Sequence, residues 1–210
     1  NPTSELIRNH WQAMLTGILI TAATAGYNGL LFAQLPAYLS KLLHYSGHVA
    51  ALAQNSALIA MTIGLLFSGW LGDKIPRRFI MRAGAGLILI LTIPFYMALQ
   101  AHQVNIFLLM ILAGLCGGLI NGTFASVVAD LFPTRVRFSG IAIAYNISFT
   151  VFSGGAPLIA TWLIAGTGSL IAPGYFMVFC AGLTFLASFP LKKLGGRIVA
   201  PPRDLSSAGV

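Results

Sequence analysis

Charged residues are scarce in this chain, and acidic residues are the scarcest. Only 8% of the 210 residues are charged, with four acidic residues against twelve Lys and Arg, whereas 57% are hydrophobic. A soluble domain of this length cannot hide so much apolar surface in its interior. The composition therefore excludes an ordinary soluble protein and favours one that crosses a membrane.

The chain also lacks the residue groupings of the common catalytic and metal sites. Its two cysteines, Cys116 and Cys180, lie in apolar stretches, where we expect them to pack as small buried residues. No glycine run and no group of His, Cys and carboxylates has the spacing of a phosphate loop, a metal site or a catalytic triad. The sequence predicts no enzyme, no cofactor and no metal site.

Long stretches without charge define the expected membrane-spanning segments. A spanning helix needs about 20 predominantly apolar residues, and the intervals between charged residues leave room for six such helices. These cover residues 13–40, 48–72, 79–100, 104–130, 139–165 and 173–192. The sequence thus predicts an all-α membrane protein with a cytoplasmic segment at 1–12, a six-helix transmembrane unit at 13–192 and a flexible cytoplasmic tail at 193–210.

The basic residues indicate the orientation of these helices. If the N-terminus is cytoplasmic, eleven of the twelve Lys and Arg residues fall in cytoplasmic segments, and only Lys41 faces outward. Short loops rich in Lys and Arg stay in the cytoplasm, so we expect both termini there. The net charge of +8 follows from this topology. It predicts contact with anionic lipid headgroups and no binding of nucleic acid.

One short segment, GWLGDKIPRR at 69–78, gathers an acid and three bases. It resembles the Gly-x-x-x-Asp-Arg/Lys-x-Gly-Arg-Arg loop between the second and third helices of each half of major facilitator superfamily transporters. The matching residues are Gly69, Asp73, Lys74, Arg77 and Arg78. The segment departs from the pattern at Pro76, which replaces a glycine and removes backbone freedom.

A second stretch, ADLFPTRVRFSGIAIAYNIS at 129–148, resembles the junction of the tenth and eleventh helices in the metabolite:proton symporter branch of that superfamily. This branch contains proline/betaine, citrate, α-ketoglutarate and shikimate carriers. The stretch has Asp130 where Glu is common, followed by the matching Pro133, Thr134, Arg137 and Gly140. The likeness covers nearly the whole chain, as the C-terminal six of twelve helices. It implies one half of a major facilitator fold, built from 3+3 inverted repeats, in a bacterial inner membrane.

The resemblance implies half of a secondary active transporter that moves a small metabolite, together with protons, by alternating access. Its partner would be the N-terminal six-helix half of the same transporter or a second copy of this chain. Since the sequence does not begin with Met, we expect it to be a piece of a longer polypeptide. A stand-alone six-helix scaffold or homodimerising module without transport activity is the alternative.

The two matched loops have a predicted conformational role. We expect Asp73 to meet the positive end of a neighbouring helix and to pair with Arg77 or Arg78. The resemblance implies that this network latches the outward-facing state, and the predicted latch comprises Gly69, Asp73, Lys74, Arg77, Arg78, Asp130 and Arg137. The alternative is that the bases only anchor the topology and that Asp73 is a solvated helix end.

Away from their ends, where His48, Arg82, Asp130 and Lys192 lie, the expected spans contain no charged residue and no histidine. The sequence therefore shows no obvious proton site at depth. Coupling would reside in the missing half or at Asp130, at the inner boundary. Uncharged polar residues do enter the spans, and the resemblance places the first and fourth helices of each half at a central cavity with the second and fifth beside it. The predicted substrate contacts are Tyr27, Asn28, Gln34, Gln54, Asn55, Asn121, Tyr145 and Asn146. The alternative for each is a hydrogen bond that only joins helices.

Overall fold

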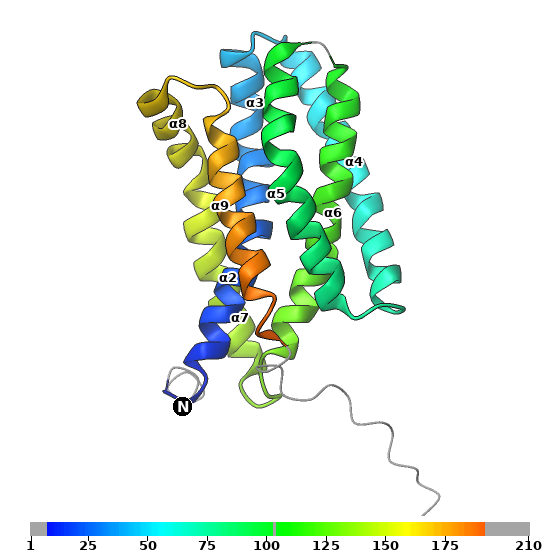
Figure 1. Ribbon diagram of the computed structural model, residues 1–210, viewed down its shortest axis with the longest axis vertical. Helices are drawn as coiled ribbons and strands as arrows, with labels where there is room; N and C mark the ends of the chain where they lie inside the picture. Colours follow the sequence, from blue (N-terminus) through cyan, green and yellow to red (C-terminus); the bar gives the residue numbers. More distant parts are fainter. Residues whose placement is uncertain (1–7, 103, 192–210) are drawn as a thin grey trace, which may run out of the picture.

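The computed structural model is a bundle of long helices that run along one common direction (Figure 1). It describes residues 8–102 and 104–191. Five helical segments of this part are long and apolar enough to cross a membrane, namely Trp11–Leu42, Gly47–Gly72, Arg77–Ala101, Ile106–Asp130 and Arg137–Thr167. The all-helical prediction is confirmed, and these five segments lie close to the first five that the charge-free stretches predict.

Two of the five segments are interrupted by π-helical turns, whereas α4 (Gly47–Gly72), α5 (Arg77–Ala101) and α6 (Ile106–Asp130) are continuous α-helices. The first segment consists of α2 (Trp11–Asn28), η1 (Gly29–Gln34), α3 (Leu35–Ala37) and η2 (Tyr38–Leu42). The fifth consists of α7 (Arg137–Ser148), η3 (Phe149–Gly154) and α8 (Ala156–Thr167). Such turns shift the helical hydrogen-bond pattern and are common at functional sites.

The last helix is shorter than the sequence predicts. We expected a span over 173–192, but α9 covers Ala172–Ala187, and its 16 residues extend about 24 Å. The chain turns at Ser188, and Pro190 follows within the turn, where it has no backbone N–H to continue the helix. By length, α9 does not qualify as a span, so the count of six spans stays a prediction. The predicted tail at 193–210 lies outside the described residues.

Helices α4 and α6 pack closely because α6 carries a glycine every four residues on the side that faces α4. A Cβ at Gly118 would lie 2.6 Å from the Met61 carbonyl oxygen, and one at Gly122 would lie 2.8 Å from the Leu65 carbonyl oxygen. Only glycine fits at these two positions without a shift of the backbone. Small residues at such spacing let two membrane helices approach each other.

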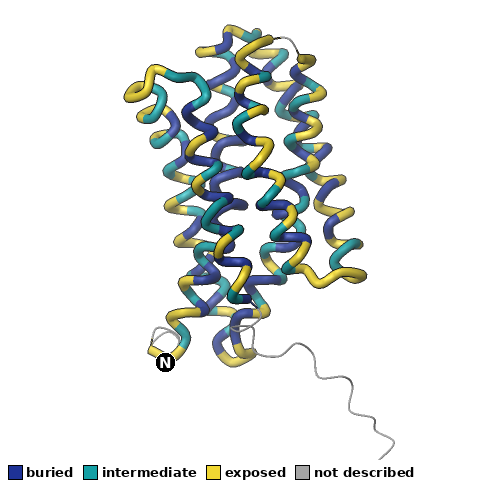
Figure 2. The backbone as a smooth tube through the Cα atoms, in the orientation of Figure 1, coloured by how far each residue is buried: buried dark blue, intermediate teal, exposed yellow. Residues whose placement is uncertain are grey.

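The first segment is the centre of the bundle, and two others are largely uncovered. In the most apolar window of each segment, 72% of the residues of Trp11–Leu42 are buried, against 28% for α4 and 17% for Arg137–Thr167. Exposed residues recur along α4 and α8 at the two sides of the bundle (Figure 2). Many exposed side chains are large and apolar, including Leu158 and Trp162 of α8. Apolar surface of this extent calls for lipid or a protein partner.

Candidate functional site

A pair of asparagines joins the first segment to α6 near the middle of both helices. The Nδ2 atom of Asn28 donates to Oδ1 of Asn121 at 3.1 Å, and Nδ2 of Asn121 donates to the Gly117 carbonyl oxygen at 2.9 Å. Asn28 is the last residue of α2, directly before the π-helical turn η1. Two residues that the sequence predicts as substrate contacts therefore meet in the structure.

Three buried oxygen atoms of the first segment have no hydrogen-bond partner among the described residues. They are Oγ1 of Thr24, Oδ1 of Asn28 and Oε1 of Gln34. Leaving a buried polar atom unpaired costs about 1–3 kcal/mol, and a buried atom of this kind requires a specific explanation. A bound ligand that donates hydrogen bonds or carries positive charge would supply the missing partner. Thr24 was not among the predicted contacts, although it lies one helical turn before Asn28.

Gln54 of α4 contacts the π-helical turn η1 directly. Its Nε2 atom lies 3.4 Å from the carbonyl oxygens of both Leu31 and Phe32. Because hydrogen bonds in a π-helix run to the fifth preceding residue, carbonyl groups near such a turn become available to side chains. Gln54 thus joins α4 to the same turn that follows Asn28.

The other predicted contacts lie on the surface of the described chain. Asn55 is exposed on α4. Nδ2 of Asn146 donates to the Ala142 carbonyl oxygen of its own helix at 2.7 Å. Tyr145 is 41% exposed and stacks on Phe149, with ring centroids 4.2 Å apart. Within the described residues, none of these three side chains is hydrogen-bonded to the asparagine pair. Their contact with substrate stays a prediction.

The two π-helical turns η1 and η3 touch each other, a contact that the sequence did not reveal. A Cβ at Gly29 would lie 2.5 Å from the Ser153 carbonyl oxygen and 2.7 Å from the Ser153 Cα atom. The backbones approach so closely that only glycine fits at position 29. The glycines Gly154 and Gly155, at the end of η3, were the signal in the sequence for an irregular helix here.

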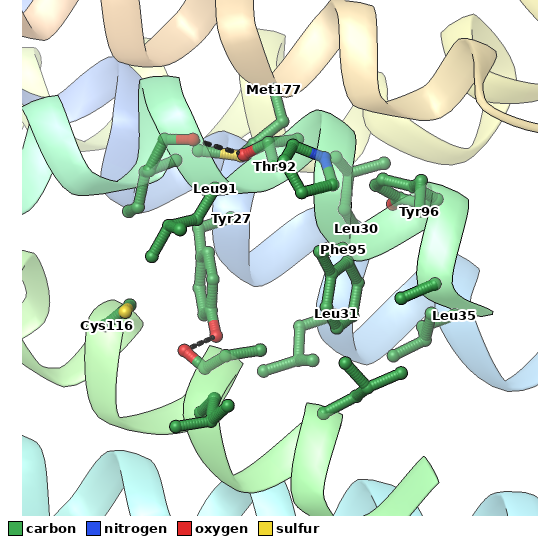
Figure 3. Close-up of a pocket in the computed structure, with 16 residues that line it drawn as sticks. Tyr27, Leu30, Leu31, Leu35, Leu91, Thr92, Phe95, Tyr96, Cys116 and Met177 are labelled. Atoms are coloured by element: carbon green, nitrogen blue, oxygen red, sulfur yellow. Dashed lines mark hydrogen bonds between the residues drawn. The ribbon is translucent and has the colours of Figure 1, made fainter. Parts of the chain in front are cut away.

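Tyr27 points to a different side of the first segment from Asn28. Its hydroxyl donates to the Ala113 carbonyl oxygen at 2.6 Å (Figure 3). Its ring lies directly against Gly117. The ring forms part of the wall of a cavity of about 280 Å³ between the first segment, α5 and α6. The structure therefore places Tyr27 in an apolar environment and separates it from the unpaired oxygen of Asn28.

The loop between α4 and α5 does not contain the ion pair that we expected. Asp73 and Arg77 are exposed, and Asp73 forms no ion pair within the described residues. The side chain of Arg77 lies back along the end of α4, where a Cβ at Gly72 would be 3.3 Å from Cγ of Arg77. The Lys74 ammonium lies 3.8 Å from the centre of the Trp70 ring. The latch role of this loop, including Gly69 and Arg78, stays a prediction.

The second matched loop is held by a different contact. Nε of Arg137 donates to the Phe132 carbonyl oxygen at 3.1 Å, and the Phe132 ring packs on Gly140. Arg137 therefore fastens the turn between α6 and α7, whereas Asp130 is exposed and has no ion pair among the described residues.

Arg82, one of the eleven basic residues that indicate the topology, also makes structural contacts that the sequence did not predict. Its Nε atom lies 3.0 Å from Oγ of Ser188, and its Nη2 atom donates to the Ser188 carbonyl oxygen at 3.0 Å. The guanidinium also lies 4.1 Å from the centre of the Phe189 ring. Arg82 thereby holds the end of α9 against α5 and occupies a carbonyl at the helix C-terminus.

A family model and several known proteins match most of this chain. The family model described as Major Facilitator Superfamily matches residues 13–206. The ectoine/proline transporter of Corynebacterium glutamicum is 33% identical over 185 residues, which cover 87% of this chain and 36% of that protein. The proline/betaine transporter of Escherichia coli (strain K12) is 30% identical over 198 residues, covering 92% of this chain and 39% of that protein.

A third relative is named for a different solute from the first two. The citrate-proton symporter of Klebsiella pneumoniae is 29% identical over 181 residues, which cover 85% of this chain and 41% of that protein. The chain thus spans about two fifths or less of the length of these curated relatives. All three are transporters, in agreement with the prediction that the chain is not an enzyme. No solved structure matches the chain significantly.

Proposed function

The chain belongs to the major facilitator superfamily, and from this premise we propose that it is the C-terminal six-helix half of a proton-coupled carrier for a small metabolite. The three relatives support this proposal because they are transporters for ectoine, proline, betaine or citrate and are much longer than the chain. The rival proposal of a stand-alone scaffold or homodimerising module gains no support from them. The carrier would lie in a bacterial inner membrane with both ends of this half in the cytoplasm.

The N-terminal half of the carrier would cover the two least buried segments. These are α4 and Arg137–Thr167, which form the two sides of the bundle. Their exposed residues include polar side chains at membrane depth, such as Asn55 and Asn146, which are poorly suited to lipid. A face that mixes apolar and polar residues fits a protein interface beside an aqueous path.

The asparagine pair and the unpaired oxygens carry the proposal for substrate binding. The three unpaired atoms belong to Thr24, Asn28 and Gln34, and the described spans offer no buried cation to hold a carboxylate. This half would therefore contact the nitrogen end of a compact zwitterion such as proline or betaine. The carboxylate end would be held by the other half, which would also contain the proton-coupling group.

Uptake by the full-length protein in proteoliposomes tests this proposal. Asn28→Ala should weaken proline binding about fivefold, because it removes one hydrogen-bonding group worth about 1 kcal/mol. Proton movement should still accompany the remaining uptake. The matched control is Asn105→Ala, since Asn105 only caps the start of α6 in a loop. No uptake of any of the relatives' solutes by the wild type would contradict the carrier proposal.

The loop at 69–78 has its own test. Asp73→Asn should slow transport several-fold and leave the equilibrium affinity for substrate nearly unchanged, because the change biases conformations and removes no substrate contact. Asp130→Asn makes the same change at the other matched loop and provides the comparison. Transport rates that do not change in either variant would reduce both loops to topology anchors.

A further inference from the structure

The cavity beside Tyr27 is suited to an apolar ligand. Its walls include Leu30, Leu31, Ile88, Phe95 and Met177, and among the described residues no charged side chain lines it. Two of the three hydroxyl groups among its lining residues, those of Tyr27 and Thr92, are already engaged, since they donate to the carbonyl oxygens of Ala113 and Ile88 at 2.6 Å each. A zwitterionic solute would lose its hydration there and gain little in return.

The cavity reaches the surface of the described chain through its outer wall. Leu91, Pro94 and Leu112 line the cavity and are also exposed, at positions on α5 and α6. Figure 3 labels Leu91 of these three. Pro94 lies inside α5, where it lacks the N–H that would bond one turn back and so weakens the helix wall at this point. The cavity is therefore accessible from outside the bundle.

The surface around this opening is uniformly apolar. The exposed residues of α5 between positions 83 and 97 are all apolar, and Leu87, Ile90 and Met97 are between 39% and 71% exposed. The exposed face of α7, η3 and α8 is different, because it contains Asn146, Thr150 and Thr161 among its apolar residues. A uniformly apolar outward face on a spanning helix fits contact with lipid chains.

We propose that this cavity binds one acyl chain of a membrane phospholipid. A cavity of about 280 Å³ is larger than the engineered apolar cavity of about 150 Å³ that accommodates benzene. An apolar space that opens into the bilayer fills with hydrocarbon, since empty space forfeits dispersion contacts. The cavity lies in the halves of α5 and α6 that are remote from the basic loops. The bound acyl chain would therefore come from a lipid of the leaflet at the Lys41 end. With the topology proposed above, this is the outer leaflet.

The bound chain would touch Tyr27, the neighbour of Asn28 in sequence. Its contacts with Leu30, Leu31 and Leu35 would lie along η1 and α3, the elements that follow the asparagine pair. Occupancy of the cavity would therefore stabilise one arrangement of the helix that also carries the proposed substrate contacts. The binding site itself depends only on the cavity and its opening, whereas this consequence rests on the proposed function.

Photocrosslinking in proteoliposomes tests the binding site. The probe is phosphatidylglycerol with a diazirine group midway along one acyl chain, and adducts in the full-length protein are mapped by mass spectrometry. We expect adducts at Phe95, Leu112 and Cys116 to exceed those at Ile90, which is 71% exposed and does not line the cavity. Added proline should not abolish the cavity adducts, because the substrate does not occupy the cavity. Adducts no more frequent in the cavity than at Ile90 would overturn the proposal.

Two variants that fill the cavity complete the test. Ala98→Phe and the smaller change Cys116→Leu should abolish adducts at Phe95, while Ile90→Phe serves as the matched control and should retain them. Adducts that persist at Phe95 in a folded, filled variant would also overturn the proposal. Since crosslinking does not require transport, absence of uptake by the wild type together with normal crosslinking would contradict only the carrier proposal.

Discussion

Tyr27 and Asn28 are neighbours in the chain, but they serve two different sides of the first helix. Successive residues of a helix point about 100° apart, so Tyr27 contributes to an apolar cavity and Asn28 meets Asn121. On the cavity side the hydroxyl groups of Tyr27 and Thr92 are paired, whereas the asparagine side keeps unpaired oxygens. If both proposals hold, one central helix separates a site for a polar solute from a site for a lipid chain.

Gly117 is the residue where the two sides meet. Its missing side chain makes room for the Tyr27 ring, and its carbonyl oxygen accepts the hydrogen bond from Asn121. Any change here acts on both sides at once. This position therefore gives the largest expected effect of a single substitution.

Gly117→Ala should destabilise the protein by about 1–3 kcal/mol, the usual cost of adding a methyl group to a well-packed site. The new Cβ would overlap the Tyr27 ring and force it to move. The loss is measured as a lower thermal midpoint of the detergent-solubilised protein. Gly182→Ala is the matched control, since a Cβ there meets only Leu89 at 3.9 Å. Equal stability of the two variants would show that Tyr27 does not occupy this position.

The asparagine pair should show a smaller, specific coupling. In a double-mutant cycle of Asn28→Ala and Asn121→Ala, we expect a coupling free energy of about 0.6 kcal/mol, as is typical of hydrogen bonds between membrane helices. The free energies of unfolding of the four proteins give this value. A second cycle of Asn28→Ala with Tyr27→Phe should give no coupling, because the two side chains serve different sides. Strong coupling in the second cycle would contradict the assignment of Tyr27 and Asn28 to different sides of the helix.

The sequence predicts five of the six expected spans closely, because charge is costly in a membrane and intervals without charge therefore mark the helices. It also predicts Asn28 and Asn121 as candidate contacts, since polar residues at depth need partners. It did not predict the π-helical turns, because a shift in backbone hydrogen bonding leaves no regular pattern of side chains. The contact of Arg82 with Ser188 was missed for another reason. It depends on where α9 ends and on the packing of α9 against α5, neither of which the local sequence determines.

The smallest expected effect comes from the hydroxyl group of Tyr27. Tyr27→Phe keeps the ring that lines the cavity and removes only the hydrogen bond to Ala113, whose carbonyl can still accept from the backbone N–H of Gly117 one helical turn later. We expect a loss of stability of about 0.6 kcal/mol or less. Proline affinity should stay unchanged, because the hydroxyl points away from the unpaired oxygen of Asn28. Equilibrium binding of radiolabelled proline to the purified full-length variant provides the measurement, with Asn28→Ala as the positive control. A similar loss of affinity in both variants would place Tyr27 in the substrate site, as the sequence alone suggests, and would remove the division between the two sides of the helix.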